Sequence, residues 1–324
     1  MTASEESDRR DADWRPASAG FLAAAYGAVY AVFALLTHGT AQHTLDLARS
    51  EALLSAATGF LLPATVLLFL VARRTDAPWS TLFQPAYLAS GIAATLIAGS
   101  TLLAFSWADV SVLVALLLMR GGVLCLSPAL DLRHRDGISA LQLTAVALSL
   151  GAVGIAILGQ EQPSLPRALV LTLAVYLAAY ALRLQLINLR AKRPRRGVRA
   201  EYARNELTWV LMLVLILVGL GRTGLGLSDL FAPKEFYSSG ALYSLVLALG
   251  TLLYLDPREN SFSIVLNRGA SVIGVLAATV MLAVLDLRAA PTTSDIGGAV
   301  LILLALTLLA RHDRRRRKAP QSMR

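Results

Sequence analysis

The sequence predicts an all-α integral membrane protein with ten membrane-spanning helices, and three observations support this prediction. The chain has 324 residues, of which 56% are hydrophobic, and its mean hydropathy is +0.61. Only 16% of its residues are charged, against about 25% in soluble domains. Several apolar runs reach the roughly 20 residues that a helix needs to cross a bilayer. Most of the chain is therefore expected to lie in spanning segments, which leaves no stretch for a soluble catalytic domain.

Ten apolar segments are expected to form these spans. They are Ala17–Thr37, Ala52–Val71, Gln84–Phe105, Val110–Leu132, Ile138–Leu158, Arg167–Ile187, Glu206–Leu225, Phe236–Leu255, Phe262–Leu285 and Ile296–Ala310. In hydrocarbon, every backbone amide must find its partner inside its own helix or in a closed barrel. Because these runs are too long for barrel strands, we expect helices.

The basic residues indicate how the chain is oriented. They cluster in the N-terminal tail (residues 1–16), the central loop (188–205) and the C-terminal tail (311–324). Such clusters stay on the cytoplasmic side, so both termini are predicted to be cytoplasmic and the loop 159–166 external. The net charge of +9 is thus interpreted as a topology signal, with membrane lipids rather than nucleic acid as partners. We expect a multi-pass protein of a bacterial cytoplasmic (inner) membrane, with no removable signal peptide.

The ten segments divide into two five-helix units, residues 17–158 and 167–310. Two short patterns recur about 150 residues apart: Tyr26/Tyr30 as Tyr176/Tyr180, and Met119-Arg120-Gly121-Gly122 as Asn267-Arg268-Gly269-Ala270. Because each unit has an odd number of spans, the second copy is expected to be inverted relative to the first. Secondary transporters use such inverted repeats to alternate access to a site between them.

Two arginines are expected inside the membrane. Arg120 lies near the middle of its segment, and Arg268 lies about two turns inside the cytoplasmic end of its own. An intramembrane guanidinium is costly unless it faces a partner or a watery cavity, whereas the acidic residues, Glu206 among them, are expected only at helix ends. We infer that the missing negative charge arrives with an anionic substrate, since guanidinium groups suit phosphate and carboxylate. The alternative interpretation is structural: an ion pair for Arg120, and a side chain that reaches the surface for Arg268.

The tyrosine pairs Tyr26/Tyr30 and Tyr176/Tyr180 are predicted to line the same cavity. Residues four apart share a helix face, and these pairs lie mid-span rather than at the membrane interfaces. Helix packing is the alternative role. No metal site is expected, because His38 and His43 stand alone in what should be an external turn around Gly39. No nucleotide-binding or hydrolase motif occurs, so we expect neither an enzyme nor a cofactor.

The pattern resembles the drug/metabolite transporter superfamily. Leu141–Gly159 and Ile296–Leu309 are similar to the glycine-containing fifth helix of its EamA-type repeats, and Ser263–Arg268 is similar to the Asn-Lys helix of its nucleotide-sugar transporters. The resemblance implies two inverted five-helix repeats and a phosphorylated or otherwise anionic substrate. It also implies that Asn267 joins Arg120 and Arg268 in binding. The chain departs from the pattern in having Arg268 in place of lysine.

These observations together predict a secondary transporter that moves a small anionic metabolite by alternating access, and phosphate-bearing metabolites are one class of such anions. Two alternatives stay open at this stage. One is an exporter of neutral or zwitterionic metabolites or amino acids, in which both arginines are structural. The other is a lipid-headgroup flippase or membrane enzyme, in which the arginines contact a lipid phosphate. A homodimer is also left open.

Overall fold

The computed structural model describes residues 19–43, 49–72, 84–105, 112–132, 140–159, 166–190, 198–221, 234–254, 260–285 and 290–318. Within these ranges the chain forms ten α-helices and no strand. The helices are α2 (Ala19–His43), α3 (Arg49–Ala72), α4 (Pro85–Phe105), α5 (Val112–Leu132), α6 (Ala140–Leu158), α7 (Arg167–Arg190), α8 (Val198–Gly221), α9 (Lys234–Tyr254), α10 (Asn260–Val284) and α11 (Thr293–Lys318). The prediction of an all-α chain is confirmed for the described residues.

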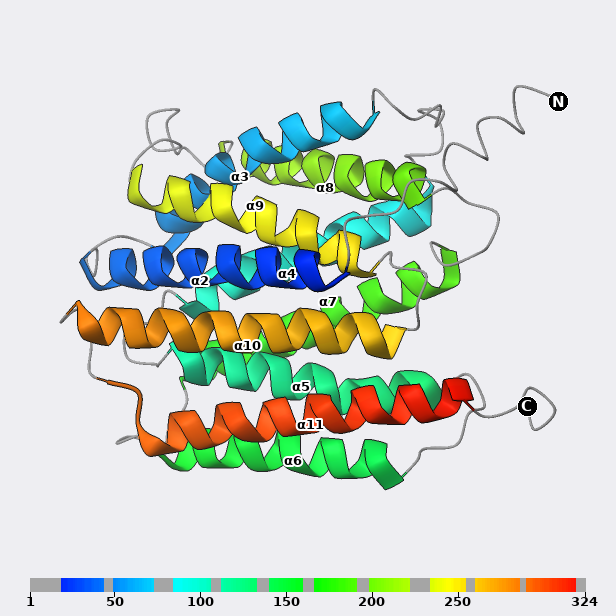
Figure 1. Cartoon of the computed structure of the whole chain (residues 1–324). Helices are drawn as coiled ribbons and strands as arrows, with labels where there is room; N and C mark the ends of the chain where they lie inside the picture. The colour runs from blue at the N-terminus through cyan, green and yellow to red at the C-terminus, as the bar shows by residue number, and fades with distance from the viewer. Residues whose placement is uncertain are drawn as a thin grey trace, which may run out of the picture.

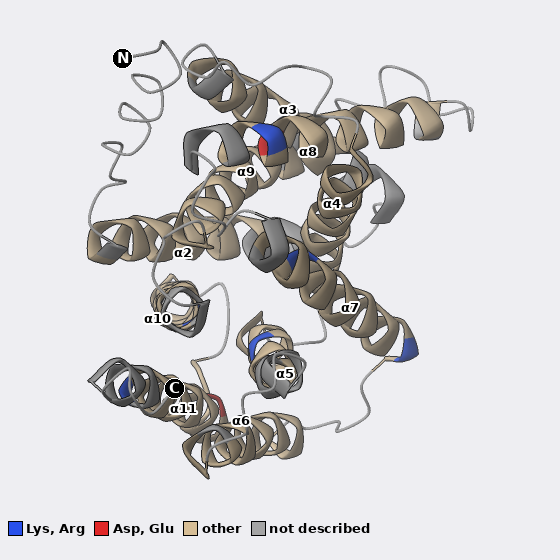
Figure 2. Cartoon of the chain, turned by 90° about the vertical axis from the view of Figure 1, so that its right-hand side faces the viewer, with Lys and Arg blue, Asp and Glu red and all other residues tan. Residues whose placement is uncertain are grey.

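The helices have the length and composition of membrane spans. Seven carry an apolar stretch of at least 18 residues, and α3, α5 and α6 carry shorter apolar stretches. Seen along the bundle, the described helices bear few charged residues (Figure 2). Their outward surface is apolar, with exposed leucine, valine and isoleucine side chains on most helices. Soluble proteins rarely expose so much contiguous apolar surface, so the chain is an α-helical membrane protein.

The helices run roughly parallel or antiparallel to one another in one bundle (Figure 1). The helix α9 packs on α2 and α3, α4 packs on α7 and α8, and α2 packs on α10. At one side of the bundle α6 and α11 pack together and contact α5 and α10. The first turn of α2 and the last turns of α11 lie at the same end of the bundle, on the right in Figure 1.

Small residues bring several helices into close contact. A Cβ atom at Gly27 of α2 would lie 2.9 Å from the carbonyl oxygen of Ala270 in α10, and one at Gly274 would lie 2.5 Å from the carbonyl oxygen of Gly27. Gly240 of α9 similarly meets the backbone of Ala56 in α3. Membrane helices associate through such contacts, because lipid offers no hydrophobic force to drive them together. The tight crossings hold α2, α9 and α10 around the centre of the bundle.

Several helices are longer than the hydropathy pattern predicts, and three of them change the expected loops or ends. The helix α8 begins at Val198 rather than Glu206 and α7 continues to Arg190, so both ends of the loop expected over 188–205 are helical. The turn expected around Gly39 is wrong, since α2 continues to His43, and α11 continues beyond Ala310 to Lys318. Hydropathy marks only the apolar part of a helix, whereas backbone hydrogen bonds extend through a polar end when its side chains find partners. In α8 one partner is Ser90, whose hydroxyl donates to Asn205 Oδ1 at 2.8 Å.

Candidate functional site

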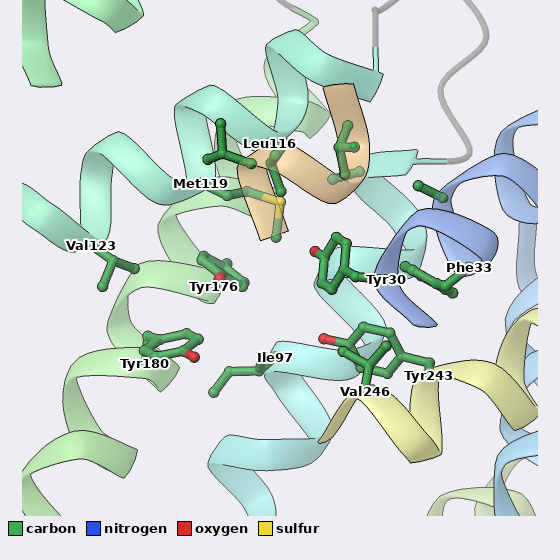
Figure 3. Packing of buried hydrophobic residues seen from close by; sticks show 14 of the residues in the cluster. Tyr30, Phe33, Ile97, Leu116, Met119, Val123, Tyr176, Tyr180, Tyr243 and Val246 are labelled. Atoms are coloured by element: carbon green, nitrogen blue, oxygen red, sulfur yellow. The ribbon is translucent and has the colours of Figure 1, made fainter. Parts of the chain in front are cut away.

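A small cavity lies at the centre of the bundle. Its volume is about 20 Å³, which is room for about one water molecule. Its lining comes from helices of both halves of the chain: Tyr26 of α2, Ile97 of α4, Arg120 of α5, Tyr176, Tyr180 and Arg183 of α7, Tyr243 to Tyr254 along α9, and Asn267 of α10. In Figure 3 the hydroxyl groups of Tyr30 and Tyr243 point from their helices toward the rings of Tyr176 and Tyr180.

Arg120 reaches this cavity from α5. Its side chain is 3% exposed. Its Nη1 donates to the hydroxyl of Tyr176 at 3.0 Å, and its Nη2 donates to the hydroxyl of Tyr26 at 3.3 Å. The guanidinium carbon also lies 5.2 Å from the centre of the Tyr30 ring, within the range of a cation–π contact. Tyrosines therefore surround the charge.

Arg268 lies next to it on α10 and is completely buried. Its Nη1 donates to the same Tyr176 hydroxyl at 3.1 Å, and its guanidinium carbon lies 4.0 Å from the centre of the Tyr180 ring. A hydroxyl oxygen has two lone pairs and can accept both bonds. The Tyr176 hydroxyl thus bridges the two arginines, one from each predicted repeat.

Several N–H groups of the two arginines have no hydrogen-bond partner among the described residues. They are Nε of Arg120 and both Nε and Nη2 of Arg268. Buried charged groups normally have all their donors paired, because the cost of leaving them unpaired is high. None of the described residues supplies an acceptor for these donors.

A chain of hydroxyl groups closes another side of the cavity. The hydroxyls of Tyr180 and Tyr254 lie 2.7 Å apart, and that of Tyr254 donates to Oδ1 of Asn267 at 3.0 Å. This relay links α7, α9 and α10. Sequence reasoning missed Tyr254, which lies at the end of an apolar segment where an interfacial tyrosine is expected.

The sequence prediction also missed a third arginine and misplaced a carboxylate. Arg183 of α7 is 6% exposed, lines the cavity and donates from Nη2 to Thr251 Oγ1 at 2.8 Å. Glu206 does not stand at a helix end as expected: it is the ninth residue of α8 and only 3% exposed. The spacing from Tyr176 and Tyr180 to Arg183 keeps all three on one helix face, a signal that could have identified the arginine.

The opposite end of the cavity is aromatic. The ring of Phe33 lies 4.9 Å from that of Tyr243 and 5.7 Å from that of Phe105, and Tyr30 packs edge-on against both phenylalanines. The hydroxyl of Tyr243 donates to Thr101 Oγ1 at 3.1 Å. One end of the cavity is thus bordered by Tyr243, with the aromatic rings packed beside it, and another by Arg183 and the tyrosine relay.

The structure brings all seven sequence-predicted site residues together. Five of them, Tyr26, Arg120, Tyr176, Tyr180 and Asn267, line the cavity, while Tyr30 and Arg268 contact it through Arg120, Tyr176 and Tyr180. That they bind a substrate stays a prediction. Within the described part of the chain, no three histidine, cysteine or carboxylate side chains are grouped as a metal site requires.

Fold and site together define an α-helical membrane protein with a buried, cationic, tyrosine-lined centre. No protein-family model matches the chain, and no curated protein matches it. Nineteen chains of solved structures do match. One of these, described only as "Crystal structure of protein", is 17% identical and has a TM-score of 0.51, and the match covers 89% of this chain and 98% of that chain. At this identity the likeness concerns the fold alone.

Proposed function

We propose that this protein is a secondary transporter that carries a small anionic metabolite across the cytoplasmic membrane by alternating access. The observation that carries this proposal is the set of unpaired guanidinium N–H donors on Arg120, which lines the central cavity, and on Arg268, which is bonded to the same tyrosine. Paired N–H groups of arginine match the oxygens of phosphate and carboxylate. An anionic substrate would complete their hydrogen bonds.

The balance of buried charge supports an anionic substrate. Arg120, Arg183 and Arg268 are buried around the cavity, and Glu206 is the buried carboxylate on their side of the bundle. Asp295 is also buried but caps α11, where it accepts a hydrogen bond from the backbone N–H of Thr292 at 3.1 Å. With the carboxylate ionised, the described side chains around the cavity carry two excess positive charges. A phosphate ester has the matching charge.

We further propose that the two halves are inverted repeats with both termini cytoplasmic. Each helix of the first half (α2–α6) can be exchanged with its counterpart in the second half (α7–α11), so that α2 corresponds to α7, α3 to α8, and so on. This exchange maps observed contacts onto other observed contacts: α4 on α7 becomes α9 on α2, α3 on α9 becomes α8 on α4, and α5 on α7 becomes α10 on α2. This pseudo-symmetry, together with the shared end of α2 and α11 (Figure 1), supports the arrangement. It also supports membership in the drug/metabolite transporter superfamily.

A cavity of about 20 Å³ is too small for a metabolite, so this conformation corresponds to a closed carrier. Substrate entry requires the aromatic end or the Arg183 end to open. Inverted repeats make two such openings possible at similar free energy, because each half can adopt the conformation of the other.

A thermal-shift screen of the purified protein tests the anion proposal. The panel holds nucleotide sugars, sugar phosphates, inorganic sulfate, amino acids and free sugars. We expect stabilisation by one or more of the anions, because a ligand that binds only the folded state raises its unfolding temperature. If none of the anions stabilises the protein, the proposal is wrong.

Transport itself is tested with the stabilising anion in proteoliposomes. Labelled anion should exchange against unlabelled anion inside, and Arg120→Gln should abolish exchange while the protein still purifies as a folded species. The matched control is Arg311→Gln, the same change at an exposed residue of α11, which should leave exchange unchanged. Equal exchange by both variants would favour a structural role for Arg120.

A carrier of zwitterionic metabolites is the second candidate, because Glu206 lies close to Arg183 and could face an ammonium group. Stabilisation by amino acids, with none by sugar phosphates or sulfate, would favour it.

A further inference from the structure

Glu206 is a buried carboxylate that the proposed anion site does not use. It is 3% exposed and lies well inside α8, in a stretch apolar enough to span the membrane. Ionisable side chains in such positions are costly and mark ion or proton pathways. The burial of Glu206 within a spanning helix therefore makes it a candidate for a role in ion or proton movement.

Arg183 is the cation of the cavity lining that also acts on this carboxylate. Both side chains have Thr251 of α9 as a neighbour: Arg183 Nη2 donates to its hydroxyl at 2.8 Å, and Glu206 approaches the same hydroxyl. One guanidinium is thus shared between a protein carboxylate and whatever enters the cavity.

No other acidic side chain takes part in this cluster among the described residues. On α8 the neighbours of Glu206 include Tyr202 and, two residues away, Arg204, which lies over the Tyr87 ring of α4. The helix α9 contributes Tyr254 in addition to Thr251, and the described side chains of α3 include no titratable group. Glu206 is therefore the carboxylate of this cluster that can gain and lose a proton.

The sharing of Arg183 couples two binding events. An anion in the cavity and an ionised Glu206 compete for the same positive charge, so each weakens the other. When the anion draws on Arg183, the carboxylate loses part of its stabilisation and its affinity for a proton rises. By linkage, a proton on Glu206 raises the affinity of the site for the anion by the same factor.

We propose that Glu206 is the proton-binding site of a proton–anion symporter. The inference rests on the proposed function and names its coupling ion. One proton from water on the entry side binds a carboxylate oxygen of Glu206 as the anion binds the arginines. Both leave on the other side, where the proton returns to water. The position of Glu206 within α8 replaces the expectation that acidic residues stand only at helix ends.

The first test measures the proton directly. Infrared difference spectra of the full-length protein in lipid nanodiscs, recorded between acidic and alkaline buffer, should show the carbonyl stretch of a protonated carboxyl group. Because the chain has 21 Asp and Glu residues, the band assigned to Glu206 is the component that is absent in Glu206→Gln. Saturating inorganic sulfate, which keeps its charge over this range, should shift the titration midpoint of the band to higher pH. In Arg183→Gln the shift should be lost. The absence of the band, or a midpoint that sulfate does not move although sulfate stabilises the protein, would overturn the inference.

The second test measures coupling in proteoliposomes, with labelled sulfate and the membrane potential clamped at zero. An inward proton gradient of one pH unit should support about tenfold accumulation, because a tenfold proton gradient drives one proton per anion. Glu206→Gln should still exchange sulfate but reach no accumulation, and Glu206→Asp, which keeps a carboxyl group, should restore part of it.

The outcomes separate the two proposals. If sulfate neither stabilises the wild-type protein nor exchanges, the proposed anion site fails for phosphate-like ligands. If sulfate exchanges but its accumulation does not depend on the proton gradient, only the proposal of proton coupling fails. The same conclusion follows if Glu206→Gln accumulates sulfate as the wild type does. Arg311→Gln serves as the charge control in both tests.

Discussion

The Tyr176 hydroxyl lies between the two arginines, where an oxygen of a bound anion could accept hydrogen bonds from both. Removing this hydroxyl with Tyr176→Phe therefore gives a specific prediction. The hydroxyl accepts one hydrogen bond from Arg120 at 3.0 Å and one from Arg268 at 3.1 Å. Each bond to a charged donor contributes about 1.5–3 kcal/mol. Because the freed donors recover part of this elsewhere, we use the lower figure and expect Tyr176→Phe to lower the free energy of unfolding by about 3 kcal/mol.

A bound anion should change this result. Its oxygens would accept the hydrogen bonds that Tyr176 supplied, so the variant should lose little stability when the site is occupied. The same difference appears as affinity: about 3 kcal/mol corresponds to roughly a hundredfold tighter binding by Tyr176→Phe. Here the tyrosine acts as a competitor of the anion rather than as its ligand.

The assay is equilibrium unfolding in mixed micelles, with and without saturating sulfate, alongside sulfate binding by the folded variant. Tyr237→Phe is the matched control, since the Tyr237 ring is only partly buried near the start of α9 and lies outside the cavity lining. An equal loss of stability with and without sulfate, or weaker sulfate binding by Tyr176→Phe, would refute the reasoning.

Two further predictions concern the scaffold. A Cβ atom at Gly91 would lie 2.5 Å from Cγ2 of Thr208 and 3.0 Å from its backbone, so Gly91→Ala should lower the free energy of unfolding by about 1–3 kcal/mol. The control is Gly99→Ala, which has open space around it and should be neutral or stabilising. Equal unfolding midpoints for the two variants would contradict the close crossing of α4 and α8. Thr292 accepts the backbone N–H of Asp295 at 3.1 Å in a reciprocal helix cap, so Thr292→Ala should cost about 1 kcal/mol and Thr292→Ser much less, as measured by the same unfolding assay.

The helical class could be predicted from the sequence because apolar length alone dictates it in a bilayer. The convergence of Arg120 with the tyrosine pairs could also be anticipated, since both patterns recur about 150 residues apart. The depth of Glu206 could not. The polar residues before it end a hydropathy window, yet they continue the helix because Asn205 finds Ser90 on another helix. Tertiary partners of this kind are invisible in a single sequence.

Arg183 shows a different limit. It lies seven residues before the end of α7, a depth from which an arginine usually reaches the headgroups. What holds it inward is Thr251 on α9, a helix more than sixty residues away in sequence. Propensity and hydropathy describe one segment at a time, whereas the choice between surface and cavity is made by a neighbouring segment.

If the protein is the proposed carrier, the size of the central cavity bears on how it avoids leaking ions when no substrate is bound. A space of about 20 Å³ holds no continuous file of water, and three guanidinium groups around it repel hydronium and metal cations. Each elementary charge that crosses 100 mV dissipates about 2.3 kcal/mol, so even a slow leak would drain the gradient. We expect proteoliposomes that contain the protein but no anion to be impermeable to protons. Protons should cross only when a bound anion screens the charge of the arginines. Removal of the guanidinium charge, as in Arg120→Gln, should then allow protons to leak across the membrane in the absence of an anion.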